Sequence, residues 1–262
     1  MSIDPSTGAA LFAVGLVAGV INAVAGGGSF LTLPALIFLG LPPTLANGTN
    51  RVGILLQNVA ALVAFDRHVA LDRSWAVVAA LPALAGAGLG TWGALVISGE
   101  AFKKVLAFLM LAVTVWTLLD PTARRRPGSK EEGEPEPPPP WREAPSGRRW
   151  VIALGFFAAG VYGGFVQAGV GFLILAVTTL AGFDLVRGNA MKALVILCFT
   201  VLSLTLFAAQ GQVDWALGLL LAVGSAAGGW LGARLTISKG HRWVRGMVTA
   251  AVVVFAVLLW FD

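Results

Sequence analysis

The sequence predicts an all-α, polytopic helical membrane protein: an inverted repeat of two five-segment halves with broken or re-entrant helices. Apolar residues make up 57% of the 262 residues, charged residues only 12%, and the mean hydropathy is +0.84. A soluble domain of this composition would leave too much apolar surface in water, whereas about 20 apolar residues cross a bilayer as one helix. Ten apolar segments can be drawn, at residues 8–25, 29–40, 48–65, 75–97, 101–119, 149–167, 172–183, 187–208, 214–236 and 243–261.

Two of the ten segments, 29–40 and 172–183, are too short to cross a bilayer. Twelve helical residues cover roughly 18 Å of a hydrocarbon core about 30 Å thick. Each short segment follows a glycine-rich stretch, and a second polar interruption runs from Ala46 to Arg51. In hydrocarbon an unpaired peptide group is costly, so such interruptions are tolerated only where they line a cavity. We therefore expect a half-span or one limb of a re-entrant hairpin at each short segment, beside a polar cavity.

The segment between the fifth and sixth apolar runs is rich in proline, glycine and charge. Such a composition cannot bury a core, so we expect a disordered connector. The expected domains are an N-terminal transmembrane repeat at 1–119, a linker at 120–149 and a C-terminal transmembrane repeat at 150–262.

The two halves resemble each other when one is shifted by 142 residues. The short segment and the interruption before it then align in the two copies. Because each half has an odd number of segments, the second half is inverted in the membrane relative to the first. The shift places Phe30 on Phe172, Gly40 on Gly182, Asn47 on Asn189 and Asn50 on Lys192.

Loop charge predicts the orientation in the membrane. Lysine and arginine gather in the linker, and the segment count places Arg67, Arg73 and Lys239 on the linker's side. The positive-inside rule makes that side cytoplasmic and puts both termini outside. No Lys or Arg precedes the first apolar run, so we expect this run to be a span rather than a cleaved signal peptide.

Polar side chains and peptide donors gather at the interruptions. A helix that restarts presents free N–H groups and the positive end of its dipole, and both attract anions. Arg51 could hold an oxyanion through two parallel N–H bonds, while Lys192 offers a point charge. The candidate substrate-binding residues are Asn22, Gly26, Gly27, Gly28, Ser29, Asn47, Thr49, Asn50, Arg51, Gln57, Gln167, Gly169, Gly171, Asn189 and Lys192.

Structural roles are the alternative for these residues. Arg51 and Lys192 could extend to the membrane interface, and Asn22, Gln57 and Asn58 could hold helices together by hydrogen bonds. The glycine stretches could pack tightly without a ligand. Other glycines four residues apart are typical of close helix packing: Gly15 and Gly19, Gly160 and Gly164, and Gly224, Gly228 and Gly232.

The sequence offers no residues suited to catalysis or metal binding. Cys198 is the only cysteine, and His68 and His241 have no Cys, Asp or Glu at ligand spacing. No acidic residue lies in the interior of an apolar run. We expect neither enzyme activity nor a metal or cofactor. The net charge of +5 lies in loops facing a membrane, so we expect no nucleic-acid partner.

The residues at the interruptions form a recognisable pattern. Gly19-x-x-Asn22-x-x-x-Gly26-Gly27-Gly28-Ser29 followed by Ala46-Asn47-Gly48-Thr49-Asn50 resembles the sulfite exporter TauE/SafE family of membrane permeases. The second half, with Gln167, Gly169-x-Gly171 and Asn189, is similar to that family's second motif. The resemblance implies an inner-membrane permease that moves sulfite or an organosulfonate, usually outward.

Together these features predict a permease that exports a small sulfur anion by alternating access around a site near the midplane. Its expected partners are the small anionic substrate and the lipid bilayer. The oligomeric state stays open, with a homodimer as one alternative. An anion channel with the same lining is the alternative function, and conduction far faster than carrier turnover would distinguish it.

Overall fold

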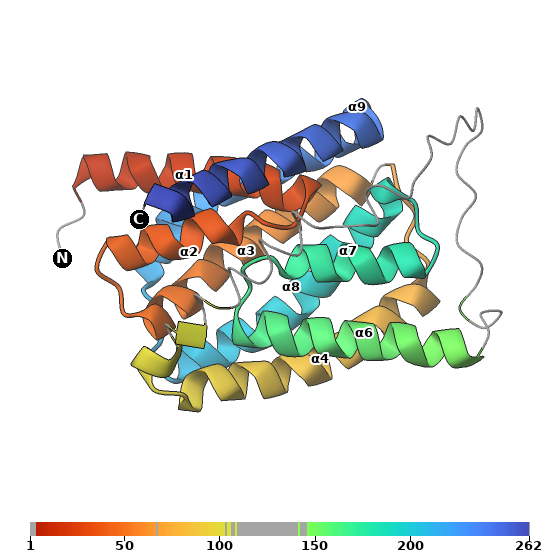
Figure 1. Cartoon of the computed structure of the whole chain (residues 1–262), viewed down its shortest axis with the longest axis horizontal. Coiled ribbons are helices and arrows are strands. Elements are labelled where there is room, and N and C mark those ends of the chain that lie inside the picture. Colours follow the sequence, from red (N-terminus) through yellow and green to blue (C-terminus); the bar gives the residue numbers. More distant parts are fainter. Residues whose placement is uncertain are drawn as a thin grey trace.

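The computed structural model describes residues 4–66, 68–102, 104, 105, 108, 141 and 146–261, with only the backbone described for 146 and 239–261. Within these residues there is no β-strand, and the prediction of an all-α fold is confirmed. Most of the linker predicted at 120–149 and most of the fifth apolar segment lie outside the described residues; of the linker, only 141 and 146–149 are described, and 146–149 already belong to helix α6. The helices are α1 Pro5–Val24, α2 Ser29–Phe38, α3 Pro43–Asp66, α4 Arg73–Val96, α6 Ser146–Phe165, α7 Val170–Leu180, α8 Leu185–Ala209 and α9 Trp215–Phe261 (Figure 1).

Four helical stretches in the described part of the chain are long and apolar enough to cross a bilayer: α1, α4, α8 and Trp215–Ser238 of α9. Large apolar side chains such as Val17, Trp92, Val201 and Leu219 stand exposed on their outer faces. Exposing so much apolar surface to water would be energetically unfavourable, whereas the hydrocarbon tails of lipids can cover it. The prediction of a polytopic helical membrane protein is therefore confirmed.

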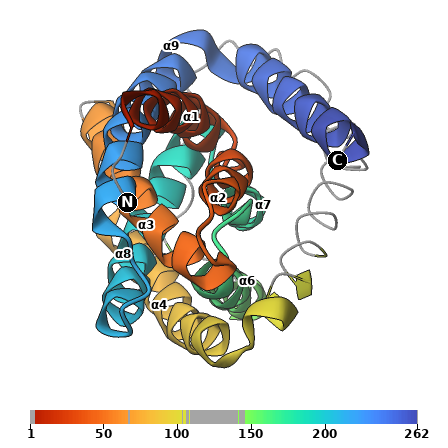
Figure 2. The same cartoon turned by 90° about the vertical axis from the view of Figure 1, so that its left-hand side faces the viewer.

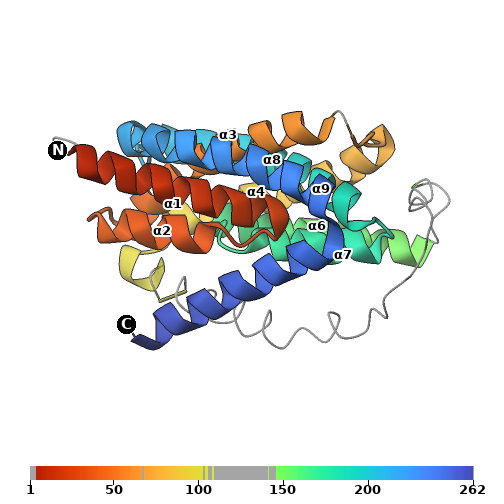
Figure 3. The same ribbon diagram turned by 90° about the horizontal axis from the view of Figure 1, so that it is seen from above.

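The two short helices are the returning limbs of two re-entrant hairpins. Figure 1 shows α2 running back along α1 toward the end of the molecule where α1 begins. The α6–α7 hairpin enters from the opposite end and returns to it. Figures 1 and 3 show α2 and α7 end to end, with their amino ends toward each other. Of the two predicted arrangements, a half-span and a re-entrant limb, the structure has the second.

The repeat predicted from the sequence extends to backbone geometry. Gly40 and Gly182, which end α2 and α7, both have φ +93°. Behind them the N–H of Leu41 donates to the Leu36 carbonyl, and the N–H of Phe183 donates to the Thr178 carbonyl. Both helices therefore end in the same left-handed glycine cap, 142 residues apart.

Glycines allow the outer helices of one half to pack on the other half. A Cβ on Gly19 of α1 would lie 2.5 Å from the Ser225 carbonyl oxygen of α9. A Cβ on Gly160 of α6 would lie 2.1 Å from the Ala83 carbonyl oxygen of α4, so only glycine allows either backbone contact. The pair α1–α9 thus repeats as α6–α4, and the packing role predicted for these glycines is confirmed. Gly86 and Gly90 of α4 also match Gly228 and Gly232 of α9 at the 142-residue shift.

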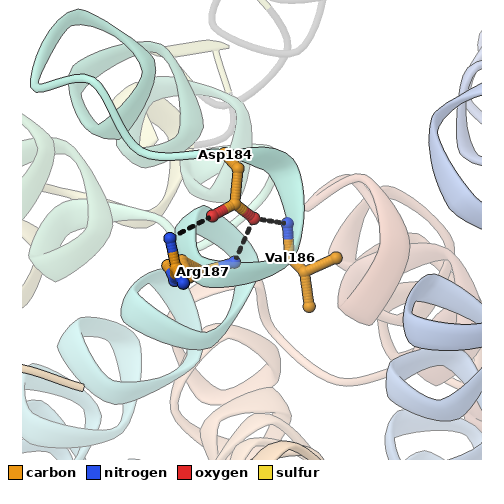
Figure 4. Close-up of polar contacts among 3 residues, drawn as sticks. All are labelled: Asp184, Val186 and Arg187. Atoms are coloured by element: carbon orange, nitrogen blue, oxygen red, sulfur yellow. Dashed lines mark hydrogen bonds and ion pairs between the residues drawn. The ribbon is translucent and has the colours of Figure 1, made fainter. Parts of the chain in front are cut away.

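Two predicted boundaries were wrong. The interruption at Ala46–Arg51 is absent, because α3 begins at Pro43, where proline suits the first turn of a helix. Asn189 likewise lies inside α8, whose start is fixed by the Asp184 carboxylate accepting the N–H groups of Val186 and Arg187 (Figure 4). These polar side chains therefore project from regular helix turns. Of the predicted polar interruptions, the ones before α2 and α7 are real breaks between helices.

The segments predicted at 214–236 and 243–261 form one helix, α9. Figures 2 and 3 show that α9 changes direction along its length. The charged residues from Lys239 to Arg245 interrupt the apolar pattern, but none of them is a proline, so the backbone hydrogen bonds of a helix can continue. A break in hydrophobicity was mistaken for a break in the helix.

We expect Gly160→Ala to destabilise the protein by about 1–3 kcal/mol, since the added methyl group must push α4 and α6 apart. Thermal unfolding of the purified protein in detergent measures this loss. Gly88→Ala is the matched control, because its Cβ would meet nothing closer than a Leu202 methyl group at 3.9 Å. A melting temperature lowered equally by both changes would contradict the packing role.

Candidate functional site

The two hairpin tips touch in the interior of the molecule through glycine. A Cβ built on Gly171 would lie 2.3 Å from the Cα of Gly26, and one on Gly26 would lie 2.4 Å from the Cα of Gly171. Gly26 has φ +98° and Gly169 has φ +77°, conformations that favour glycine at each tip. The sequence predicted two separate glycine breaks, and the fold places them in direct backbone contact.

Four helix ends meet at this contact. α1 and α6 bring their carboxyl ends, with the negative end of the dipole, and α2 and α7 bring their amino ends, with the positive end (Figures 1 and 3). Neither Gly28 at the start of α2 nor Gly169 at the start of α7 provides a side-chain cap. The last carbonyl groups of α1 and α6, in contrast, receive side-chain donors from the opposite half.

Lys192 of α8 caps the carboxyl end of α1. Its Nζ donates to the carbonyl oxygens of Asn22 at 2.7 Å and Ala23 at 3.0 Å, and to Oδ1 of Asn189 at 2.6 Å. An ammonium group has three N–H donors, so these three acceptors use all of them. Lys192 was predicted as a substrate-binding residue, but in this conformation its donors are fully engaged by the protein.

Arg51 of α3 caps the carboxyl end of α6 in the same way. Its Nη1 donates to the Gly163 carbonyl at 3.2 Å and its Nη2 to the Gly164 carbonyl at 2.6 Å. Asn47, one turn earlier, donates through Nδ2 to the Phe165 carbonyl at 2.9 Å. The first half thus caps the second through Arg51, and the second half caps the first through Lys192.

Neither cation reaches the membrane interface. The side chains of Arg51 and Lys192 are 0% and 2% exposed, and the Arg51 guanidinium also lies 4.7 Å from the ring of Phe207. The alternative that they extend to the interface is therefore wrong. A buried cation is costly unless paired, and here helix-end carbonyls and an aromatic face surround the charge.

Several predicted site residues hold helices together around the contact. Asn22 donates to Oε1 of Gln57 at 3.2 Å, joining α1 to α3. Asn58, named with them as a residue that could join helices, instead donates within α3, to the Ile54 carbonyl. Thr49 accepts the Asp214 N–H at 2.9 Å and so ties α3 to the start of α9, away from the hairpin tips. A Cβ on Gly28 would lie 1.9 Å from the Ala18 carbonyl oxygen, which explains that glycine by packing alone.

The remaining predicted residues lie at or beside the tips. Ser29 is buried at the start of α2, and a Cβ on Gly27 would contact the ring of Phe172 at 2.8 Å. The Asn189 side chain accepts a hydrogen bond from Lys192 and donates to the Leu185 carbonyl at 2.9 Å, so it fixes the position of the Lys192 ammonium group. The structure therefore gathers the predicted residues around one interior contact, with Thr49 as the exception.

Sequence reasoning missed several polar residues that meet this region. Thr91 of α4 donates to the Gly164 carbonyl at 3.1 Å and pairs with the Ser203 hydroxyl at 2.8 Å. The Tyr162 hydroxyl donates to the Ala168 carbonyl at 2.6 Å and supports the second tip. Isolated Thr, Ser and Tyr residues in apolar helices give no sequence signal until the neighbouring helix is known.

Some buried polar atoms at the second tip have no hydrogen-bond partner within the protein. Within the described residues they include both amide atoms of Asn50, Oδ1 of Asn47, Nε of Arg51 and Oε1 of Gln167. All four side chains are at most 2% exposed. Unpaired polar atoms at such depth are costly, so they indicate where a polar ligand could bind.

A cavity of about 420 Å³ lies elsewhere, at the end of the molecule where α3 begins. Thr44, Leu95, Gln210 and Gln212 are among its lining residues. Asn47 lies on α3 three residues after Thr44, about one helical turn away. Among the described residues, no group of His, Cys, Asp and Glu could hold a metal ion.

Comparison with known proteins identifies the chain. The sequence model of the sulfite exporter TauE/SafE family matches residues 11–259. The chain belongs to this family. A probable membrane transporter protein of Haemophilus influenzae is 32% identical over 246 residues, covering 92% of this chain and 89% of the relative. The probable membrane transporter protein YfcA of Escherichia coli is 29% identical over 264 residues, covering 99% and 92%. No solved structure matches.

This TauE/SafE protein is thus a multi-pass membrane transporter and not an enzyme, as the sequence predicted. A transporter implies a small-molecule substrate and a lipid bilayer as its surroundings. The polar groups gathered at the hairpin tips are the candidate binding site.

We expect Lys192→Met to destabilise the transporter by about 3 kcal/mol, because it leaves the carbonyls of Asn22 and Ala23 and the amide of Asn189 without their donor. Chemical or thermal unfolding in detergent measures the loss. Arg234→Met is the control: its guanidinium is exposed and lies 4.1 Å from the Trp230 ring, a contact worth less than about 1 kcal/mol. Equal losses would argue against the capping role.

Proposed function

We propose that this transporter exports a small sulfur-containing anion, sulfite or an organosulfonate, by alternating access around the contact of the two hairpin tips. The proposal combines the membership of the sulfite exporter TauE/SafE family with the charge arrangement at the tips. The charge arrangement carries the argument for an anion.

The electrostatics at the tips favour a negative solute. The carboxyl ends of α1 and α6 are neutralised by Lys192 and Arg51, while the amino ends of α2 and α7 have no side-chain cap. The local balance is therefore positive, since two uncompensated positive dipole ends remain. Among the side chains described, no Asp or Glu is buried, so no carboxylate offsets this potential.

The opposed hairpins support alternating access. One hairpin enters from each side of the fold, and each is capped by a cation on the other half (Figure 1). Separation of the Gly26–Gly171 contact on one side at a time would expose the tips to one compartment and then the other, as in other inverted-repeat transporters. The backbone contact itself then acts as the closed gate.

We propose the orientation and domain arrangement predicted from the sequence. The end of the molecule that carries Arg73, Arg148, Arg149 and Arg187 would be cytoplasmic in the inner membrane, by the positive-inside rule. The starts of α1 and α9 would lie outside, with repeats at 1–119 and 150–262. An interior-negative potential then assists export by about 2.3 kcal/mol per charge per 100 mV, without a coupling ion.

Flux into liposomes tests the function directly. Purified transporter is expected to carry sulfite or an organosulfonate, faster than chloride or sulfate, and to respond to an imposed potential in the direction of an anion. Protein-free liposomes control for leak. Conduction at channel rates would replace the carrier mechanism with an anion pore, and no flux of any sulfur anion would refute the proposal.

We expect Gly171→Ala to lower transport by about tenfold or more, because its methyl group would hold the tips apart and misalign the donors. Initial flux per reconstituted protein measures the effect. Gly147→Ala is the matched control, since its Cβ would meet nothing within 4 Å. If both variants transport like the original chain, the tip contact has no part in transport.

A further inference from the structure

The free hydrogen-bonding capacity at the hairpin tips is unequal between the two halves. At the first tip, Lys192 and Asn189 satisfy each other and the end of α1. At the second tip, Asn50 occupies the position that Lys192 has in the other half, and neither of its amide atoms has a partner in the protein. The hydrogen-bonding atoms that are available to a ligand therefore lie around Asn50, at the second tip.

The unpaired atoms on this side belong to one neighbourhood. Asn47, Asn50 and Arg51 occupy one turn of α3, where residues three and four apart are adjacent. Asn47 and Arg51 contact the last carbonyls of α6, and Gln167 follows α6 by two residues and donates to the Thr200 hydroxyl. Asn47 and Arg51 thus bring unpaired atoms to the carboxyl end of α6, Asn50 lies on the same turn of α3, and Gln167 lies just beyond the end of α6.

These atoms are of two kinds. Nε of Arg51 and Nδ2 of Asn50 are donors, which suit the oxygens of an oxyanion. Oδ1 of Asn47, Oδ1 of Asn50 and Oε1 of Gln167 are acceptors. The orientation of Asn47 is fixed, because its Nδ2 must face the Phe165 carbonyl, and Asn50 presents one donor group and one acceptor whichever way it is turned.

A fully deprotonated oxyanion has acceptors only and cannot bond to amide oxygens. A substrate that carries its own O–H can donate to the amide oxygen of Asn47, Asn50 or Gln167 while its other oxygens accept from Arg51 and Asn50. The pairing of donors with acceptors matters here because these atoms are buried, and a buried polar atom without a hydrogen-bond partner costs its full desolvation free energy. We infer that the Asn47–Asn50–Arg51 turn, with Gln167, binds a singly charged oxyanion that retains a proton, such as hydrogen sulfite rather than sulfite.

This inference rests on the proposed function and specifies which form of the substrate moves. The titratable groups near this turn are Arg51 itself, Tyr162, whose hydroxyl donates to Ala168, and Lys192 across the tip contact, which is engaged by α1. No buried carboxylate is found among the described side chains to carry a proton separately. The proton therefore travels on the substrate.

A pH gradient distinguishes the two forms by direction. Proteoliposomes are loaded with equal total sulfite on both sides at zero potential, with the two compartments on either side of the near-neutral pKa of hydrogen sulfite. If hydrogen sulfite is carried, its concentrations equalise and total sulfite accumulates several-fold on the alkaline side. If the dianion is carried, total sulfite accumulates on the acidic side, and the inference is overturned.

Protein-free liposomes correct for passive movement of dissolved sulfur dioxide. Absence of protein-dependent sulfite movement also overturns the inference. The flux of methanesulfonate and hydroxymethanesulfonate then tests the proposed function. Transport of either compound supports the export of a sulfur-containing anion, and transport of neither refutes both this function and the inference about hydrogen sulfite.

Asn50→Leu tests the residue. We expect its apparent affinity for sulfite to fall about tenfold or more, with a melting temperature unchanged or raised because the amide has no protein partner to lose. Asn58→Leu is the matched control on α3, since the Asn58 amide donates within its own helix, to the Ile54 carbonyl at 2.7 Å. We expect its transport to stay unchanged. Unaltered sulfite affinity in a folded Asn50→Leu transporter would overturn the assignment.

Discussion

The structure depends on how four helix ends can meet inside a membrane. Each re-entrant hairpin exposes carbonyl groups where its first helix ends and N–H groups where its second begins, at a depth where water is scarce. The carbonyls of α1 and α6 are satisfied by Lys192 and Arg51, each from the opposite half. Both halves are therefore needed to complete either tip, and the repeat cannot be separated without exposing buried polar groups.

The same arrangement gives the centre its chemical character. Cations on the carboxyl ends remove the negative poles, and the amino ends of α2 and α7 keep their positive poles. A polar centre with a positive balance is thus a consequence of the topology, and it suits a family described as sulfite exporters. The buried Lys192 is better understood as a residue that creates this field than as one that binds the substrate, because its three donors are engaged, whereas Arg51 caps α6 and keeps its Nε free for a ligand.

The repeat is symmetric in its scaffold and asymmetric at its centre. Glycine caps, hairpin tips and helix-packing glycines recur at a shift of 142 residues, as Gly40 and Gly182 or Gly86 and Gly228 show. At the centre, Asn50 in one half stands where Lys192 stands in the other. Under the proposed alternating access, a symmetric scaffold allows equivalent inward and outward states, whereas an asymmetric centre allows one substrate orientation to be preferred.

The sequence by itself determined the membrane environment, the two short helices, the repeat and most residues of the tip region. These features follow from local properties: apolar run length, glycine where the chain must turn, and polar residues too costly to bury without purpose. It gave wrong boundaries at Ala46–Arg51 and within α9, because polar residues interrupt hydrophobicity without breaking a helix. Only the tertiary structure decided which donor meets which carbonyl, that Gly26 touches Gly171, and which amide atoms stay unpaired. Those facts depend on contacts between residues more than a hundred positions apart, which no local pattern encodes.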